Sequence, residues 1–294
     1  MKSLFGGNTE FFNGKEWIKI KDYKKHDKVL TYGLDGYAKL QTPTKFIKEK
    51  IEYINKLSMG RLDMYLSDEA LFIGKTRSNV ENHTFTLKEL YMSNMSLLTH
   101  CHLYNTFQYE DSNSLLSTSK LRVMANCIII GNIDNSSNCT VIKNKSDANE
   151  YRYLLKTSKI KYTSKKSNDK EIFKHRLPRS IDLLLDNMLN FNRVEANVIM
   201  DEIHKISNGR KILIKDNRFI DFMQMIYTLG GKRCIVNNNN ISISNKCTTR
   251  IGNVESIKNN IIEEKFQYSF IVQNEYIVVR NNGVINIMGA YRKI

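Results

Sequence analysis

Short runs of β-prone residues alternate with polar positions at the start of the chain. Such runs cover Thr9 to Phe12, Glu16 to Ile20 and Lys28 to Tyr32, and Asn13-Gly14 separates the first two. An Asn-Gly pair between two such runs is a strong signal for a β-hairpin. A second turn signal follows at Asp35-Gly36. The opening section is therefore predicted to be a β-meander.

The pattern changes in the middle of the chain. A Ser-rich stretch from Ser112 to Ser119 has the composition of a linker, and the apolar run Leu121 to Ile130 follows it. Residues Arg179 to Lys205 carry apolar side chains at helical intervals, and a further helix is predicted over Phe219 to Tyr227. The strand-like run Arg233 to Val236 comes next. This section is predicted to be α+β.

The end of the chain returns to β-prone runs. These cover Tyr268 to Val272, Tyr276 to Val279 and Val284 to Ile287, with polar turns between them. A β section at each end predicts one all-β domain that is interrupted by an α+β insertion. We assign residues 1–111 and 251–294 to the all-β domain and residues 112–250 to the insertion. A chain of 294 residues is long enough for two cores.

Hydropathy and cysteine usage narrow the class of protein. No apolar run has the length of a membrane span, and the N-terminus lacks the apolar core of a secretory signal, so we expect a cytoplasmic protein with no membrane partner. The five cysteines include no Cys-x-x-Cys pair, which argues against a disulfide framework and against a zinc site. We expect buried free thiols, no metal and no cofactor.

The formal net charge of +15 comes from lysine-rich stretches such as Lys15 to Lys28, Lys156 to Lys170 and Lys205 to Lys215. Such an excess attracts polyanions through phosphate neutralisation and counterion release. The chain is also rich in Asn and Ile, as AT-biased coding would produce. Double-stranded DNA as a partner and a compositional origin of the charge therefore both remain open.

Both ends of the chain resemble the terminal blocks of phage-type inteins. Gly7 to Trp17, followed by Asp27 to Leu30, resembles the family's opening hairpin and its G-D-K-V-L block, with His26 where Gly is usual. Tyr276 to Gly289 is similar to the ending V-x-R-R-N-G-x-I-x-I-x-G-N. The resemblance implies a Hint fold with adjacent chain ends, self-splicing activity, and flanking extein segments of a host polypeptide as partners. A phage origin would place the protein in a bacterial cell.

The predicted insertion resembles the LAGLIDADG homing endonuclease that such inteins often carry. Leu121 to Gly131 is similar to its first helix, and Leu213 to Val236 to its second half. The family's DNA cleavage uses a carboxylate at the end of each LAGLIDADG helix to hold a divalent metal. Ile130 occupies the first of these positions, with Asp134 out of register, and Ser207-Asn208 occupies the second. DNA cleavage is therefore not expected.

Several lysines of the predicted insertion could still contact a DNA backbone, because phosphate contacts need only positive charge and no cleavage chemistry. They are Lys156, Lys159, Lys161, Lys165 and Lys166.

Splicing begins when a nucleophile at the first intein residue attacks the preceding carbonyl. Family spacing places that residue at Leu4, and one inserted residue would place it at Ser3, either a weak hydroxyl nucleophile or simply a terminal serine. The family's T-x-x-H motif, whose histidine protonates the departing amide nitrogen, corresponds to Ser67 and Ala70. The general acid is therefore missing, although His83, His100 or His102 could substitute for it in principle.

Splicing ends when a terminal Asn cyclises onto its own backbone carbonyl. Here Gly289 is followed by Ala290, which has no nucleophile, and by Tyr291, where Ser, Thr or Cys is expected. Ser269 stands where the family often places a cysteine. Cyclisation cannot occur with these residues, so whether the chain is an enzyme at all stays open.

Three hypotheses follow from these residues. The first is an intein-like autoprocessing element that is defective in splicing and in DNA cleavage, either by natural decay or because Ala70 and Ala290 were introduced to trap a precursor. The second is a non-cleaving DNA-binding module that derives from a homing endonuclease. The third is a structural domain inside a larger phage protein.

Overall fold

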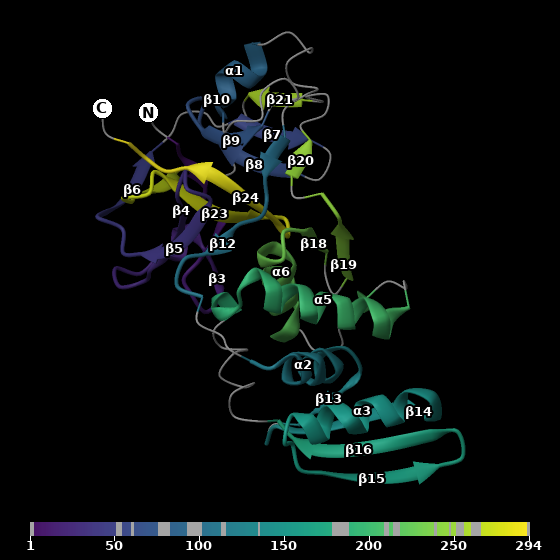
Figure 1. Ribbon diagram of the computed structural model, residues 1–294. Helices are drawn as coiled ribbons and strands as arrows, with labels where there is room; N and C mark the ends of the chain where they lie inside the picture. The colour runs from purple at the N-terminus through teal and green to yellow at the C-terminus, as the bar shows by residue number, and fades with distance from the viewer. Residues whose placement is uncertain are drawn as a thin grey trace. The chain divides into compact units, whose positions relative to one another are not determined.

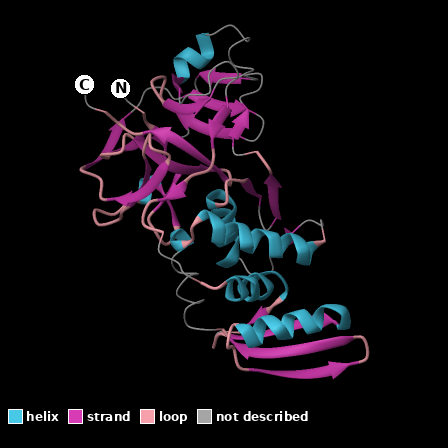
Figure 2. Ribbon diagram, viewed as in Figure 1, coloured by secondary structure: helices cyan, strands magenta, loops and turns pink. Residues whose placement is uncertain are grey.

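The computed structural model describes residues 3–50, 55–59, 62–75, 83–92, 102–112, 116–134, 136–177, 188–208, 212–213, 218–237, 240–246, 248–250, 256–259 and 266–292. Within these ranges the protein is mostly β-sheet with a few helices (Figure 1, Figure 2). Two compact units are present. The first comprises Met1–Asp111, Gly231–Asn237 and Ile243–Ile294, and the second comprises Ser112–Gly230 with Asn238–Ser242.

In its described residues, the first unit contains short strands, the short α-helix α1 and the 3₁₀ turn η1. Its elements are β1 (Phe5–Gly6), β2 (Glu10–Phe12), β3 (Trp17–Lys19), η1 (Ile20–Asp22), β4 (Val29–Tyr32), β5 (Tyr37–Gln41), β6 (Lys45–Lys50), β7 (Asn55–Met59), β8 (Leu62–Leu66), β9 (Leu71–Lys75), β10 (His83–Thr86), α1 (Leu87–Met92), β11 (His102–Tyr104), β12 (Gln108–Tyr109), β18 (Arg233–Asn237), β20 (Thr248–Arg250), β21 (Ser256–Asn259), β22 (Phe266–Ile271), β23 (Tyr276–Asn281) and β24 (Val284–Gly289).

Strands β2 and β3 form the hairpin that the Asn-Gly signal predicts, with Phe12 opposite Trp17. Its loop has four residues rather than two. The side chain of Asn13 accepts hydrogen bonds from the backbone N–H groups of Lys15 and Glu16, and Gly14 has a φ of 104°. Asn-Gly thus sets the turn through a side-chain acceptor and one left-handed residue.

A second hairpin joins β23 to β24 near the end of the chain. Asn282 and Gly283 have φ values of 47° and 72°, the pair of positive angles that a type I′ turn requires. The N–H of Val236 donates to the carbonyl of Gly283, and a β-carbon added at Gly283 would lie 1.9 Å from the Val236 carbonyl oxygen. Glycine therefore fits this position for both its backbone angle and its close neighbour.

Strands from the two ends of the chain pair with each other. One sheet has the order β21-β7-β8-β1-β22-β6, in which Phe5 lies opposite Tyr268. A second sheet contains the path β12-β5-β4-β23-β24-β18, and its strand β23 also pairs with β2. The meander prediction was incomplete, because a local pattern predicts a strand but not a partner far along the chain.

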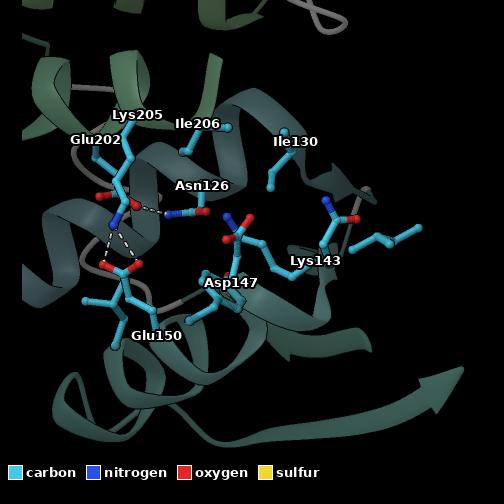
Figure 3. Close-up of a pocket in the computed structure, with 12 residues that line it drawn as sticks. Asn126, Ile130, Lys143, Asp147, Glu150, Glu202, Lys205 and Ile206 are labelled. Carbon is cyan, nitrogen blue, oxygen red and sulfur yellow. Dashed lines mark hydrogen bonds and ion pairs between the residues drawn. The ribbon is translucent and has the colours of Figure 1, made fainter. Parts of the chain in front are cut away.

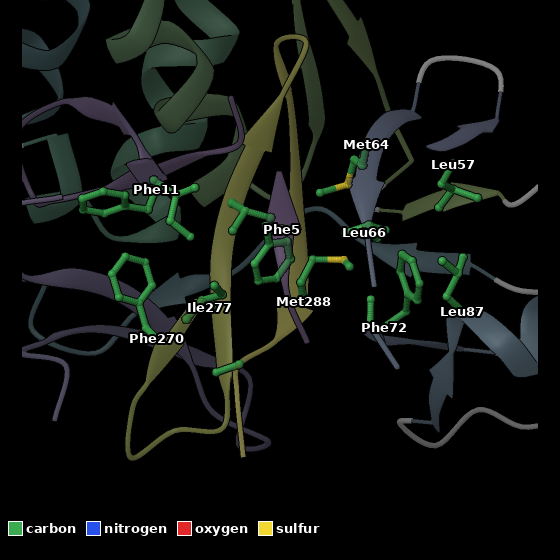
Figure 4. Packing of buried hydrophobic residues seen from close by; sticks show 14 of the residues in the cluster. Phe5, Phe11, Leu57, Met64, Leu66, Phe72, Leu87, Phe270, Ile277 and Met288 are labelled. Atoms are coloured by element: carbon green, nitrogen blue, oxygen red, sulfur yellow. The ribbon is translucent and has the colours of Figure 1, made fainter. Parts of the chain in front are cut away.

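The core of the first unit lies between these strands. Phe5, Phe11, Phe72, Phe270 and Met288 are all fully buried in one cluster (Figure 4). The rings of Phe11 and Phe270 meet edge to face, with their centroids 5.2 Å apart. Since these residues come from both ends of the sequence, their burial favours closing the ends into one core.

The second unit is an α+β arrangement. Its elements are α2 (Thr118–Ile130), β13 (Asn132–Ile133), β14 (Asn138–Asn144), α3 (Lys145–Thr157), β15 (Tyr162–Ser167), β16 (Lys170–Arg176), η3 (Met188–Asn190), α5 (Arg193–Ser207), β17 (Ile212–Leu213) and α6 (Arg218–Leu229), together with β19 (Asn240–Ser244), whose last two residues belong to the first unit. Four strands form an antiparallel sheet in the order β13-β14-β16-β15, and α3 lies along one face of it (Figure 1). Among the described helices, none is long and apolar enough to span a membrane.

Helix α5 begins and ends at residues typical of helix caps. A capping box between Asn192 and Glu195 starts α5, and Asn208, in the left-handed conformation, ends it. Helix α6 covers the predicted Phe219 to Tyr227 and extends it at both ends. Of the helical pattern predicted from Arg179 to Lys205, residues 179–187 lie outside the described residues.

The second unit ends earlier than residue 250, the end of the predicted insertion. Residues Gly231–Asn237 belong to the first unit because Ile235 of β18 pairs with Val284 of β24. The sequence shows a strand after Gly230-Gly231 but not which sheet receives it. The N-terminal part of the first unit ends at Asp111, and the second unit begins at Ser112.

Candidate functional site

Ser3 lies buried just before β1. Its hydroxyl oxygen accepts a hydrogen bond of 3.0 Å from the backbone N–H of Leu71, the first residue of β9. No other partner of this hydroxyl is described. The oxygen is therefore held in place by the backbone, and no base lies beside it in the described contacts.

Ser67 contacts the chain one residue further on. Its hydroxyl oxygen accepts from the N–H of Leu4 at 3.1 Å, and its own N–H donates to the Leu4 carbonyl at 3.1 Å. Ser67 also begins a turn, which the N–H of Ala70 closes by donating to the Ser67 carbonyl. The segment from Ser67 to Ala70 thus lies against the N-terminal peptide at Leu4.

Ala70 is fully buried at the end of this turn and is part of the apolar core. Its carbonyl accepts from the N–H of Leu87. A methyl group in an apolar cluster can neither donate nor accept a proton. Of the histidines considered as replacements, His100 lies outside the described residues, as do the side chains of His83 and His102.

The C-terminal candidates follow one another where β24 ends. Gly289 lies opposite Tyr276, and the N–H of Ala290 donates to the Glu275 carbonyl at 2.7 Å. Tyr291 donates its N–H to the carbonyl of Phe270 at 3.0 Å. Its phenol donates to Glu49 at 3.2 Å. The backbone at this end is fixed by strand pairing, while Ala290 offers no reactive side chain.

The two sets of candidates meet at Ser3 and Gly289. A β-carbon added to Gly289 would lie 3.2 Å from the Ser3 hydroxyl oxygen and 2.5 Å from the β-carbon of Leu71. The start and the end of the described chain are therefore in contact, as a Hint fold would require. Both segments flank β9, whose residue Phe72 pairs with Met288.

Ser269 belongs to β22, next to Phe270, and is fully buried. Its hydroxyl has no hydrogen-bond partner among the described residues. It pairs with Ile47 across the sheet.

The contacts at the N-terminal end fall on two different peptide bonds. A nucleophile at Ser3 would attack the bond that precedes Ser3, whereas Ser67 holds the amide N–H of Leu4, in the bond that follows Ser3. Leu4 occupies the first position that family spacing gives, and its side chain is apolar. The Ser3 hydroxyl and the Leu4 amide that Ser67 binds would therefore take part in cleavage of different peptide bonds.

Sequence patterns alone did not identify the groups that fix these candidates. The N–H of Leu71 donates to Ser3, while the carbonyls of Glu275 and Phe270 accept from the N–H groups of Ala290 and Tyr291. Backbone groups carry no sequence signal, so only the fold can identify them. Glu49, which accepts from Tyr291, lies on β6, and its partner could not be predicted without the β6-β22 register.

In the second unit, helices α2 and α5 pack against each other. Their ends correspond to the positions where the LAGLIDADG family has its catalytic carboxylates. Helix α2 ends at Ile130 and α5 at Ser207, so neither of these ends carries a carboxylate. A cavity of about 280 Å³ beside Ile130 is also lined by Asn126, Lys143 and Glu202 (Figure 3).

Two of the three acids that line this cavity, Glu150 and Glu202, are paired with cations. Glu202 accepts from Arg122 at 2.7 Å and from Asn126 at 2.8 Å. Glu150 accepts from Lys205 at 2.6 Å and is also paired with Arg122, and these hydrogen bonds lower the pKa of Glu150 below its ordinary value. The network ties α2, α3 and α5 together.

Asp134 lies in the turn between β13 and β14 rather than in the cavity. One of its carboxylate oxygens accepts from the backbone N–H groups of Ser136 and Asn138, and the other accepts from the Asn138 side chain. The hydrogen bonds from Asn138 lower the pKa of Asp134. Its role is that of a turn residue.

The lysines considered for DNA contact divide between surfaces. Lys165 lies on the face of the sheet opposite α3, because its cross-strand partner Ile172 alternates with the buried Phe173. Lys170, Lys174 and Arg176 share that face and are exposed. Lys166 points the other way, while Lys156, Lys159 and Lys161 lie at the end of α3 and in the connection after it.

Comparison with known proteins gives little that bears on the site. No protein-family model matches the chain, and no curated protein matches it. Among solved structures, the chain is similar to a GSH-linked, splice-inactive variant of the AceL NrdHF class 3 split intein. The TM-score is 0.40 at 10% identity, over 99% of this chain and 100% of that one. A match at this level assigns neither a fold nor an activity to the chain.

Proposed function

We propose that the first unit is a Hint-type protein-splicing domain that has kept its scaffold and lost its chemistry. The observation that supports this is the contact of Ser3 with Gly289, with Ser67 bound to the Leu4 amide beside it. A splicing domain needs its two junctions together, because the flanking segments are joined there. Adjacent ends also suit a domain lodged inside a host polypeptide.

The defect follows from the residues at the reacting positions. Leu4 offers no nucleophile at the amide that Ser67 holds, and Ala70 offers no proton for the departing nitrogen. Ala290 cannot cyclise, and Tyr291 presents a phenol that Glu49 already binds. Because the nucleophile is missing as well as the acid, natural decay explains the chain better than two alanines introduced into a working domain.

The first test rebuilds the N-terminal half reaction. The full chain is placed between two reporter segments, and Leu4→Cys with Ala70→His is compared with Ser3→Cys with Ala70→His. The new thiol attacks the preceding carbonyl, the histidine protonates the departing amine, and an added thiol then releases the upstream reporter from the thioester. Mass spectrometry should show release from the Leu4→Cys pair, because Ser67 holds that amide, and none from the unaltered chain.

The matched control is Leu4→Cys with Ala70→Gln, which adds bulk and a hydrogen-bonding group at position 70 but no acid. Overpacking at this buried position costs about 1–3 kcal/mol, so each variant's thermal melt is recorded. Folded variants that release nothing with cysteine at either position 4 or position 3 would contradict the proposal.

The second test rebuilds the C-terminal half reaction. With Ala290→Asn, the new side-chain amide attacks its own backbone carbonyl, forms a succinimide and frees the downstream reporter. We expect slow release from Ala290→Asn and none from Ala290→Gln, whose longer side chain disfavours the same ring. Intact protein after prolonged incubation of a folded Ala290→Asn chain would show that this end is not a splice junction.

For the second unit we propose a non-cleaving DNA-binding module derived from a LAGLIDADG endonuclease. The observation that favours it is the exposed sheet face with Lys165, Lys170, Lys174 and Arg176, which carries no acidic residue on β14, β15 or β16. Four cations on one surface suit contact with phosphates. The ends of α2 and α5 carry no carboxylates, so cleavage is not part of the proposal.

Mobility shifts of duplex DNA over a salt series test this second candidate. Lys165→Gln with Lys174→Gln should weaken binding and reduce the slope of log K against log salt by about 2, one for each lost phosphate contact. The control pair, Lys24→Gln with Lys25→Gln, removes the same charge from the first unit. It should change the DNA affinity and the salt slope less than the first pair does. No shift at low salt, or equal losses from the two pairs, would rule out the sheet face as the DNA-binding surface.

A further inference from the structure

Two cysteines and a histidine meet in the core of the second unit. Cys127 comes from α2, Cys139 from β14 and His175 from β16, and all three side chains are buried. One ligand atom from each lies within 4.8 Å of those of the other two. The Cys127 sulfur is 3.9 Å from Nε2 of His175.

These separations suit a shared metal ion. Zinc binds thiolate sulfur at about 2.3 Å and imidazole nitrogen at about 2.0 to 2.1 Å, so tetrahedral or trigonal ligands are about 3.5 to 4 Å apart. The contact between Cys127 and His175 falls in this range. Small changes of side-chain torsion would bring three atoms within 4.8 Å of one another onto one ion.

A fourth polar atom lies at the same place. The phenol oxygen of Tyr151 is 2.9 Å from Nε2 of His175 and 3.9 Å from the Cys127 sulfur. It could complete a four-coordinate site or donate a hydrogen bond to a metal-bound thiolate. Outer-shell donors of this kind orient ligands and tune the metal.

One cation lies beside the cluster. Lys143 places its ammonium 5.5 Å from the centre of the Tyr151 ring. Two thiolates and one divalent ion together are electrically neutral, which removes the cost of burying an isolated charge.

We propose that Cys127, Cys139 and His175 bind one thiophilic divalent cation of the zinc class, with Tyr151 beside it. Because the ligands come from three separate elements, the ion would pin α2 to the sheet and add its binding energy to the stability of the unit. On binding, each thiol gives up its proton to solvent and no redox step is needed.

The experiment uses the full chain, reduced and stripped of metal by a chelator. Titration with Co²⁺ should give one equivalent per chain with a thiolate-to-cobalt charge-transfer band in the near ultraviolet, and Zn²⁺ should displace it. The melting temperature should rise with either ion. Proton release on binding Zn²⁺, followed with a pH indicator, is a second readout that needs no variant.

Cys139→Ser and His175→Gln should each abolish the charge-transfer band or lower the affinity for cobalt at least tenfold. The control is Cys234→Ser, which alters a buried cysteine of the first unit and should leave the band unchanged. If Cys139→Ser does not fold, the proposal is tested by His175→Gln and by the number of protons released when the unaltered chain binds Zn²⁺. The absence of a charge-transfer band, or a band lost in Cys234→Ser but kept in His175→Gln, would overturn the proposal.

Discussion

The hydroxyl oxygen of Ser3 faces Gly289, so that a methyl group on Gly289 would lie only 3.2 Å from it. The same methyl would lie 2.5 Å from the β-carbon of Leu71, which is attached to the backbone of β9 and cannot turn away. This contact brings the start and the end of the chain together. Any side chain at position 289 has to push them apart.

Gly289→Ala should therefore destabilise the first unit by about 1–3 kcal/mol, the usual cost of overpacking. Thermal unfolding followed by near-UV circular dichroism measures the loss. The control is Gly36→Ala, where an added β-carbon meets nothing within 4 Å and only the φ of 90° adds strain. A melt of Gly289→Ala equal to that of the unaltered protein would show that the ends do not pack as described.

Two buried serines should respond differently to loss of the hydroxyl. Ser3→Ala leaves the N–H of Leu71 without its acceptor in a buried place, which costs about 1–3 kcal/mol. Ser269→Ala removes a buried hydroxyl that has no described partner, so it should be neutral or stabilising. Denaturant unfolding of the two variants makes the comparison. Equal losses would show that the Ser3 hydrogen bond contributes nothing particular.

Local features of the fold were predictable from sequence because local chemistry determines them. Asn13-Gly14 and Asn282-Gly283 specify turns through left-handed residues, and the type of these turns does not depend on the rest of the chain. For Leu121 to Ile130 the sequence showed only a continuous apolar run, and the structure has a helix there. The ends of elements, such as the start of α2 at Thr118, were less well predicted.

What the sequence did not reveal is how distant segments meet. Helix α3 is strongly polar, so a search for apolar runs passes over it even though Tyr151 and Leu155 are buried. Cys127, Cys139 and His175 are far apart in sequence, and no spacing rule connects them. At the candidate splice site, Ser67 was predictable from its motif, whereas the Leu71 N–H that holds Ser3 was not.

The pKa of Glu150 predicts how the second unit responds to acid. Hydrogen bonds from Lys205 and Arg122 lower it below the ordinary 4.5, so the folded state holds this carboxylate ionised more strongly than the unfolded chain does. Its contribution to stability is present above about pH 4.5 and is lost as the pH falls through the lowered value.

Glu150→Gln should therefore lower stability at neutral pH and flatten its decline in acid. Urea unfolding at several pH values, followed by far-UV circular dichroism, tests this. Glu110→Gln is the control, because Glu110 pairs with Lys39 across an exposed surface of the first unit. Parallel curves for Glu150→Gln and the unaltered protein would contradict the expectation.

The last prediction concerns Arg280, which joins the hairpins of the two chain ends. Its guanidinium donates to both carboxylate oxygens of Glu10, at 2.6 and 3.1 Å, and lies 4.7 Å from the centre of the Trp17 ring. A lysine keeps the charge but cannot make the forked contact or stack on the indole in the same way. Arg280→Lys should therefore destabilise the first unit by about 1.5 to 3 kcal/mol, the range for hydrogen bonds to charged groups.

The matched substitution is Arg292→Lys, because Arg292 also pairs with a glutamate, Glu275, but its side chain is 39% exposed against 11% for Arg280. Water screens an exposed pair, so that change should cost about 0–1 kcal/mol. The salt dependence distinguishes the two substitutions further. A higher salt concentration should leave the effect of Arg280→Lys on stability nearly unchanged, because the forked pair stacks on the Trp17 ring and is largely shielded from solvent. An Arg280→Lys protein as stable as Arg292→Lys would mean that Glu10 and Arg280 do not link the two ends.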